Sequence, residues 1–251
     1  MIFYKSDDEI ELMREAGQIV ADVLSYIKPR IRSGMSTAEL ESLALERLKK
    51  MAPDAIPSFK GYMGYPSAMC ISINSEVVHG IPSKSKIILE GDIVSVDFGV
   101  VYKGYNGDAA FSVVVGKGSQ EAHNVVKVAE EALYEGIKHA KVGKRLHDIS
   151  SAIQEYVESH GYSVVRDFVG HGIGRNMHES PQVPNFGEPG TGVKIESGMT
   201  IAIEPMVNTG GYDVMVLNDG WTAVTSDGSL SAHFEHTLAI TDKGTFVLTE
   251  L

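Results

Sequence analysis

Two stretches of this chain, far apart in the sequence, repeat one pattern that ends in a carboxylate. Residues 91–97 and 198–204 each begin with glycine, continue with apolar residues at alternate positions, and reach an acid at the seventh position. A second acid-bearing stretch follows each of them, at 108–113 and 235–240. Because side chains alternate between the faces of a β-strand, each acid shares its face with smaller residues. The stretches are therefore predicted to be strands that present four carboxylates, Asp97, Asp108, Glu204 and Glu235.

Four carboxylates on apolar strands predict a metal site. A buried carboxylate is costly unless a cation compensates it, and like charges at close range force proton uptake. Two divalent cations would neutralise the four charges. The segment 171–178 adds two histidines among glycines, which let the backbone pass close to a metal or a substrate; its spacing differs from that of a helical HExxH motif. The candidate metal ligands are Asp97, Asp108, His171, Glu204 and Glu235.

This ligand set predicts hydrolysis. Two metal ions bridged by carboxylates lie roughly 3.5–4 Å apart and lower the pKa of bound water to about 7, which supplies hydroxide at neutral pH. A histidine that is not a ligand could then stabilise the carbonyl or serve the leaving amine. Taken alone, Asp97, His79 or His178 is more often a structural residue, and it is the repeated placement of the acids that favours a site. The other histidines lack such a context: His123, His139, His147, His160, His233 and His236.

The composition is that of an ordinary globular protein. The chain of 251 residues has 43% hydrophobic and 22% charged residues and a formal net charge of -11, which argues against a nucleic-acid-binding protein. Cys70 is the single cysteine, so an internal disulfide is excluded and a reducing compartment is favoured. The first ten residues contain no apolar signal segment, and no stretch is long and apolar enough to span a membrane. The expected location is the cytoplasm.

Four amphipathic helical segments are expected, in two pairs. The first begins after Ser6, and the second after Ser36, where Glu39 three positions later makes a capping-box pattern. The third begins after Ser119, and the fourth runs near 146–160. In each segment the apolar residues recur at the three- and four-residue spacing of one helical face. These segments are therefore predicted to pack on the acid-bearing strands.

The elements are expected to form one α+β domain that spans residues 1–251. Its two halves, roughly 1–117 and 118–251, each contain two helices, a histidine-bearing segment and two acid-bearing strands. The chain is thus interpreted as one long internal duplication. A curved antiparallel sheet would hold the site, and the two helix pairs would pack on its outer face.

Several motifs together resemble those of one family. They are Cys70-Ile71-Ser72-Ile73-Asn74 with His79-Gly80-Ile81-Pro82, Gly170-His171-Gly172-Ile173-Gly174, Ile203-Glu204-Pro205-Met206, and Glu235-His236-Thr237. Over nearly its whole length the chain resembles the type I methionine aminopeptidases, in the bacterial form without an amino-terminal extension. The resemblance implies the pita-bread fold, which agrees with the duplication.

The resemblance gives each candidate ligand a role. It makes Asp97 the bidentate ligand of one metal ion, and makes Asp108 and Glu235 the residues that bridge both ions. His171 and Glu204 would complete the shell of the other ion, and Glu204 is also the candidate base for the bridging water. The implied cofactors are two divalent ions, and the ligands are compatible with Co, Mn, Fe or Zn.

The resemblance also implies the surroundings of the substrate. His79 would lie near the substrate amine and the scissile nitrogen, and His178 near the carbonyl oxygen. Asn74 and Ser231 match positions of a monovalent-cation site. Together with these two histidines, the methionine pocket maps to Phe59, Tyr62, Tyr65, Cys70, Met177 and Trp221. The family's usual residue types are replaced at three positions, Phe59, Met63 and Met177, so the shape of the pocket stays open.

The function implied is removal of the initiator methionine from peptides and nascent proteins whose second residue is small. An unbranched, polarizable side chain suits an apolar pocket lined by sulfur and aromatic groups. The expected partners are peptide and nascent-protein N-termini, with the ribosome as a further candidate. Neither specific nucleic-acid recognition nor membrane binding is expected, and the chain is expected to be a monomer.

Three alternatives stand beside this function. An X-Pro aminopeptidase or prolidase would share the scaffold, and such enzymes usually carry a large amino-terminal domain. A peptide-binding module without activity would be expected to lose ligands, whereas all five candidates are present. A carboxylate-bridged redox protein would be expected to show helical Glu-x-x-His pairs, which this sequence lacks.

Overall fold

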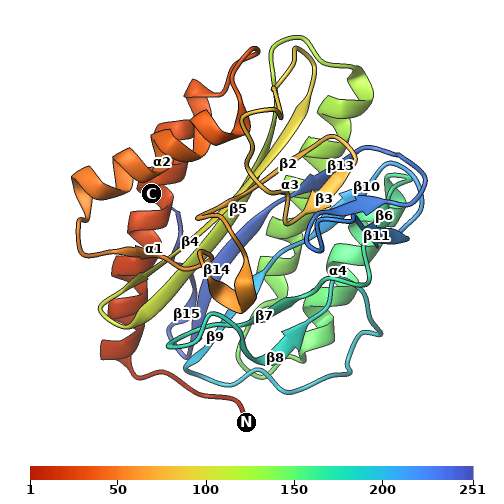
Figure 1. Cartoon of the computed structure of the whole chain (residues 1–251). Coiled ribbons are helices and arrows are strands. Elements are labelled where there is room, and N and C mark those ends of the chain that lie inside the picture. The colour runs from red at the N-terminus through yellow and green to blue at the C-terminus, as the bar shows by residue number, and fades with distance from the viewer. Residues whose placement is uncertain (251) are drawn as a thin grey trace.

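A curved, fully antiparallel sheet forms the centre of the molecule (Figure 1). The computed structural model describes residues 1–250. The main sheet runs in the order β1 (Ile56–Pro57), β4 (Ile93–Tyr102), β5 (Tyr105–Val114), β14 (Glu235–Thr241), β9 (Met199–Ile203), β7 (Gly170–Gly172) and β8 (Glu179–Val183), with β2 (Cys70–Ile73) on β4 and β15 (Gly244–Val247) on β14. Two three-stranded sheets join β13 (Ser231–His233), β10 (Met206–Asn208) and β6 (Ser163–Val164), and β11 (Val214–Val216), β12 (Ala223–Thr225) and β3 (Glu76–Val78).

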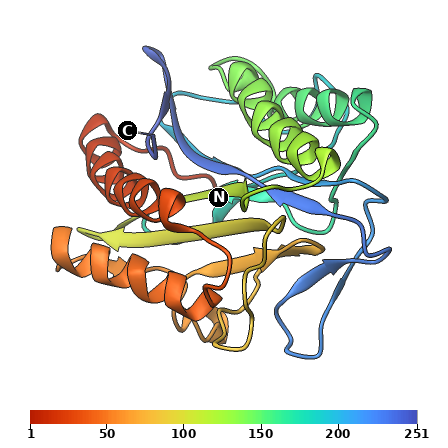
Figure 2. The ribbon, with the colours of Figure 1, turned by 90° about the horizontal axis from the view of Figure 1, so that it is seen from above.

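Four helices pack against the main sheet in two pairs. They are α1 (Asp7–Ile27), α2 (Thr37–Met51), α3 (Gln120–His139) and α4 (Leu146–Ser159), with short 3-10 turns η1 (Lys28–Arg30) and η2 (Tyr62–Gly64). α1 lies on β4 and β5 with α2 beside it, and α3 lies on β5 with α4 beside it. Figure 2 shows the pairs at opposite ends of the sheet. The predicted α+β class, with a curved antiparallel sheet and two helix pairs, is confirmed.

The helices begin where their capping residues predict. The Ser36 hydroxyl accepts the Glu39 N–H at 3.3 Å, while the Glu39 carboxylate accepts the Ser36 N–H at 2.7 Å. This is the predicted capping box. Ser6 caps α1 through the same pair of hydrogen bonds with Glu9, and the Ser119 hydroxyl accepts the N–H of Ala122 at the start of α3. The fourth helix ends at Ser159, one residue before the predicted boundary.

Alternation along β4 separates the core from the site. Val94, Val96 and Phe98 are fully buried in the large apolar core that the helices complete. Asp97, between two of them, points to the opposite face and lines a cavity. The tight packing behind it depends on small residues, because a Cβ on Gly107 in β5 would lie 2.7 Å from the backbone nitrogen of Gly17 in α1. The backbones of α1 and β5 are therefore in direct contact at these two glycines.

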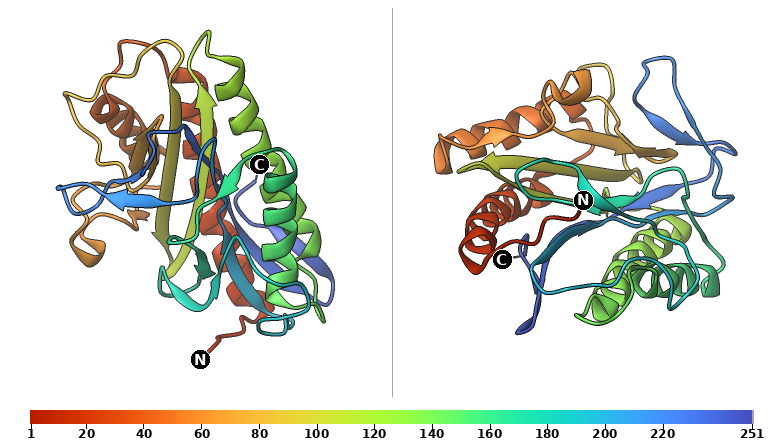
Figure 3. Two further views of the ribbon diagram at one scale, coloured as in Figure 1. Left: turned by 90° about the vertical axis from the view of Figure 1, so that its right-hand side faces the viewer. Right: turned by 90° about the horizontal axis from the view of Figure 1, so that it is seen from below.

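Strands from both parts of the chain meet in the middle of the sheet, where β5 pairs with β14. Figure 3 shows this arrangement from the side and from below, with the hairpin of β11 and β12 pointing away from α3 and α4. The division into related halves at 117 and 118 stays a prediction. Among residues 1–250 there is no helix with the length and apolar character that crossing a membrane requires.

Candidate metal centre and substrate pocket

The register of three neighbouring strands brings Asp97, Asp108 and Glu235 together. Asp97 in β4 lies opposite Ala110 in β5, and Ala110 in turn lies opposite Glu235 in β14. The small alanine between the two carboxylates leaves room beside them. Asp108 lies opposite Gly99, where a Cβ would stand 3.1 Å from the Asp108 Oδ1 atom. Small residues therefore make space for the acids, as the sequence pattern predicted.

The remaining two candidate ligands are His171 in β7 and Glu204, the residue that follows β9. His171 pairs with Ala202, which places its ring beside Glu204, two residues further along. The His171 Nε2 atom lies 3.6 Å from the Glu204 Oε1 atom. Its Nδ1 donates to the carbonyl of Gly172 at 2.9 Å, so the Nε2 lone pair faces the acids. This tautomer is the one that a metal-ligating histidine needs.

The donor set fits a metal. One ligand atom each from Asp108, His171 and Glu235 lie within 4.8 Å of one another. Three buried carboxylate oxygens in this cluster, one each on Asp97, Asp108 and Glu235, have no hydrogen-bond partner. Such atoms are costly to bury unless a cation compensates them. Oxygen-rich sites with one imidazole suit divalent first-row metals.

A cavity of about 160 Å³ opens next to these donors. Its apolar wall places Trp221 edge-on to Tyr65 at a centroid distance of 5.1 Å. Met177 is buried in the wall, whereas Met63 is 82% exposed. All the predicted metal ligands, catalytic histidines and pocket residues line it: Phe59, Tyr62, Tyr65, Cys70, His79, Asp97, Asp108, His171, Met177, His178, Glu204, Trp221 and Glu235, together with Met63.

Two histidines that are not candidate ligands line the cavity, His79 and His178. The His178 Nδ1 atom lies 2.8 Å from the Tyr62 hydroxyl, and a tyrosine that donates there leaves the Nε2–H of His178 as a donor. The ring of His178 lies 4.2 Å from that of His171. His79 packs edge-on against Phe168 at 5.3 Å. Its backbone has a φ of 61°, an uncommon conformation outside glycine that is often found at functional sites.

Sequence comparison with known proteins supports a peptidase. The profile of Metallopeptidase family M24 matches residues 11–242. The chain belongs to metallopeptidase family M24. A methionine aminopeptidase from Clostridium acetobutylicum is 53% identical over 249 residues, which are 99% of either chain. The resemblance to the bacterial type I methionine aminopeptidases is thereby confirmed.

Comparison with solved structures gives the same result. The methionine aminopeptidase of Thermotoga maritima is 52% identical and has a TM-score of 0.97 over all of both chains. The prolidase of Pyrococcus furiosus has a TM-score of 0.79 at 25% identity; the match covers 99% of this chain and 65% of the prolidase. The pita-bread fold expected from the sequence is therefore confirmed, and the match extends over the full length of an aminopeptidase.

Burial governs the electrostatics of this M24 centre. Desolvation raises the pKa of Asp97 to about 7. Burial also raises the pKa values of Asp108, Glu204 and Glu235, and neighbouring carboxylates add to the effect. For His171, burial lowers the pKa to about 3, which keeps the imidazole neutral at pH 7. A neutral imidazole beside several buried carboxylates provides a set of ligands for cations.

These shifts predict how metal binding depends on pH. A carboxyl group whose pKa rises on folding contributes stability at low pH and loses it as the pH rises; for Asp97 the window runs from 3.8 to about 7. Divalent cations bind the deprotonated carboxylates and offset this loss. At a hundred times its Kd, Mn²⁺ should add about 2.7 kcal/mol, or roughly 5–10 °C of thermal midpoint, at about pH 7.5.

The stabilisation by Mn²⁺ should be smaller at about pH 5, where protons compete with the metal for the carboxylates. Thermal unfolding of metal-free and Mn²⁺-loaded protein at both pH values measures it. The Asp97→Asn variant is the control, because it removes one titrating ligand and should reduce the pH dependence. Equal increments at both pH values would contradict the assignment of these carboxylates as ligands.

The structure adds one residue that sequence reasoning passed over. His233, in β13, is 2% exposed, and its Nε2 atom lies 4.0 Å from the Glu204 Oε2 atom without a hydrogen-bond partner. Burial lowers its pKa to about 3, with a further contribution from His79. The period-two alternation that links Ser231, His233 and Glu235 was the available indication, because it places all three on one face.

The proposed monovalent-cation site lies outside the cavity. The Ser231 N–H donates to the Asn74 carbonyl at 2.8 Å, so the two residues are neighbours. The Asn74 side chain is already engaged, because it donates to Asp92 and accepts from Ile93. The Ser231 hydroxyl is buried without a partner. Oxygen ligands here would therefore come from that hydroxyl and the Asn74 carbonyl, and the site stays a prediction.

Proposed function

We propose that this M24 peptidase is a methionine aminopeptidase that releases the N-terminal methionine from peptides and nascent proteins with a small second residue. The observation that supports it most directly is the single cavity in which an apolar, sulfur- and aromatic-lined wall adjoins the carboxylate cluster. An unbranched thioether side chain fits such a wall. The preference for a small second residue rests on the similarity to the named aminopeptidases.

Two divalent ions are proposed in the centre, held by Asp97, Asp108, His171, Glu204 and Glu235. When bound, divalent ions supply Lewis-acid activation of water and of the substrate carbonyl. Glu204 would act as the proton acceptor; its carboxylate lines the cavity, and its Oε1 atom lies 3.6 Å from the His171 Nε2 atom. A raised pKa, caused first by burial, suits a base that must hold the proton taken from the attacking water.

The two cavity histidines are proposed to serve the peptide bond. Burial lowers the pKa values of both His79 and His178, so each is neutral and carries one N–H donor. His178 would donate its Nε2–H to the substrate carbonyl oxygen, with Tyr62 orienting the ring. His79 would lie near the scissile nitrogen and donate a hydrogen bond there, while the proton that Glu204 takes from water would pass to the leaving amine.

The test of this function is the release of free methionine from short peptides. Met-Ala-Ser should be hydrolysed readily, Met-Leu-Ser far more slowly, and a Gly-Pro peptide not at all. The comparison separates the proposal from the prolidases, which share the fold. Preferential cleavage of the Gly-Pro peptide would replace the proposed activity with that of a proline-specific peptidase.

Replacing His178 by alanine should reduce kcat by about a hundredfold, because one donor to the developing oxyanion is lost. Metal content should stay unchanged, because His178 is not proposed as a ligand. Metal analysis and steady-state kinetics on the same preparation measure both quantities, with the exposed His139→Ala as the control. Loss of metal together with activity would instead make His178 a ligand.

The remaining proposals concern context. A cytoplasmic location is consistent with the one cysteine, Cys70, which is buried and forms no disulfide. Nascent chains as substrates make the ribosome a candidate partner, and a monomer is proposed. Asn74 and Ser231 are proposed to bind one monovalent cation.

A further inference from the structure

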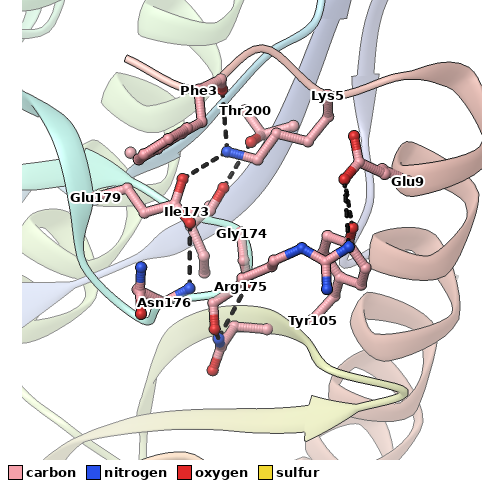
Figure 4. Close-up of polar contacts among 12 residues, drawn as sticks. Phe3, Lys5, Glu9, Tyr105, Ile173, Gly174, Arg175, Asn176, Glu179 and Thr200 are labelled. Atoms are coloured by element: carbon pink, nitrogen blue, oxygen red, sulfur yellow. Dashed lines mark hydrogen bonds and ion pairs between the residues drawn. The ribbon is translucent and has the colours of Figure 1, made fainter. Parts of the chain in front are cut away.

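The amino-terminal segment lies against the chain that follows the second cavity histidine. Ile2 forms a parallel bridge with Ser180 in β8, and the Lys5 N–H donates to the Gly198 carbonyl at 2.7 Å. Figure 4 shows the Lys5 side chain reaching from this segment toward the loop 173–179. The first residues of the chain thus run beside the loop that carries His178.

Lys5 and Glu179 form a buried ion pair. The Lys5 Nζ atom lies 2.5 Å from the Glu179 Oε2 atom, and only 5% and 4% of the two side chains are exposed. The same ammonium group donates to the Phe3 carbonyl at 3.1 Å. It is the most buried of the lysine and arginine ion pairs among residues 1–250. Buried pairs are weak evidence for net stability, and a role in specifying geometry is the alternative to test.

The second oxygen of Glu179 fixes the loop itself. Its Oε1 atom accepts the Asn176 N–H at 3.1 Å, so one carboxylate holds both Lys5 and the loop backbone (Figure 4). The backbone packs directly on the pair, since a Cβ on Gly174 would stand 2.5 Å from Lys5 Cε and 2.7 Å from Glu179 Oε1. Asn106 completes the fixation by donating to the Gly174 carbonyl at 3.0 Å.

His178 is held within this turn. It lies between Asn176 and Glu179, which are joined by the hydrogen bond just described. Its Nδ1 atom lies 2.8 Å from the Tyr62 hydroxyl. His171, at the start of the same segment, is instead placed by the pairing of β7 with β9. The pair therefore acts on the position of His178 and leaves the metal ligand to the sheet.

We propose that the Lys5–Glu179 pair, with its hydrogen bond to Asn176, is a positioning device for His178. The proposal rests on the proposed function, in which His178 donates to the substrate carbonyl. Without Lys5, the carboxylate of Glu179 loses the ammonium group that holds it, and the turn 176–179 is less firmly fixed. The imidazole of His178 then moves away from the position of the substrate carbonyl oxygen. A displacement of about 1 Å is enough to cost up to a hundredfold in rate. Lys5 is thus a positioning residue, distant from the reacting atoms in sequence.

The test begins with Lys5→Met, which removes the charge and keeps an apolar stem. We expect kcat for Met-Ala-Ser to fall about tenfold or more, while KM and metal content change less than about threefold. Lys243→Met is the matched control, because Lys243 pairs with Asp7 at 2.8 Å on the surface, with 74% and 77% of the two side chains exposed. Its kcat should equal that of the unchanged protein.

A double-mutant cycle separates positioning from general damage. In a His178→Ala background, Lys5→Met should lower kcat less than about twofold, because the group that it positions is gone. An equal loss in both backgrounds, or an unchanged kcat in folded Lys5→Met, would overturn the proposal. Should Lys5→Met not fold, the isosteric Glu179→Gln is taken through the same cycle with the same criteria.

Failure of the proposed function can be distinguished from failure of the positioning proposal. If the proposed function is wrong, the protein without substitutions will release no methionine, and this is measured before any variant is compared. A normal kcat in His178→Ala alone would refute the catalytic role of that histidine, and the positioning role of Lys5 with it.

Discussion

Replacing Glu204 by glutamine is expected to leave the fold intact and to lower kcat by about 10²–10⁴-fold, the usual contribution of a general base. Glutamine keeps the size and one carbonyl oxygen of the side chain but cannot take a proton from water. Because the carboxyl group is buried with a raised pKa, its replacement by a neutral group also removes a destabilising charge. The metal-free variant should therefore unfold at the same temperature as the unchanged protein or higher.

Steady-state kinetics on Met-Ala-Ser, circular dichroism and thermal unfolding together measure this result. Glu188→Gln is the control, because Glu188 is exposed and the same chemical change there should leave kcat untouched. Near-normal hydrolysis by Glu204→Gln would remove Glu204 from the mechanism. Loss of secondary structure would show instead that its role is structural.

Removal of divalent cations is expected to reduce activity to below about 1% of that of the loaded enzyme. The loss of even about 2.7 kcal/mol of transition-state stabilisation is a hundredfold in rate, and divalent ions contribute several kcal/mol in such sites. Chelation followed by removal of the chelator gives the metal-free protein. Activity should return on adding Mn²⁺, Co²⁺, Fe²⁺ or Zn²⁺, since all suit the ligand set.

Calorimetric titration of the same protein counts the ions. Two binding events are expected from four carboxylates and one histidine, and Asp97→Ala should eliminate or strongly weaken one of them. A single event in the unchanged protein would contradict the dinuclear proposal while leaving metal dependence in place. Full activity in rigorously metal-free protein would refute metal catalysis altogether.

The parts of the fold that could be predicted from sequence follow local rules. The side chains of Ser36 and Glu39 each accept a hydrogen bond from the other residue's backbone N–H, so the start of α2 needs no distant contact. Alternation on β4 correctly separated Val96, in the core, from Asp97, at the cavity. The helix end at Ser159 was placed one residue late, because the last turn of a helix frays and its boundary depends on the chain that follows.

The candidate site divides in the same way. The residues expected at the metal centre and in the pocket line one cavity, and their individual roles stay predictions. His233 was passed over because its contact with Glu204 depends on β13 pairing with β10 in a separate small sheet. No sequence pattern indicated a role for Lys5, since its partner Glu179 lies in a distant part of the chain.

By itself, the sequence indicated which residues are candidates for the chemistry and which face of each strand they occupy, and it determined to which family the motifs belong. Those properties follow from side-chain alternation, capping and residue type, which act over a few positions. The tertiary structure decided the register that sets Asp97, Ala110 and Glu235 in one row. It also decided the burial that shifts the carboxyl pKa values and the pairing of the amino terminus with the loop of His178. Registers, burial and long-range ion pairs depend on how distant segments pack, and no local pattern encodes that packing.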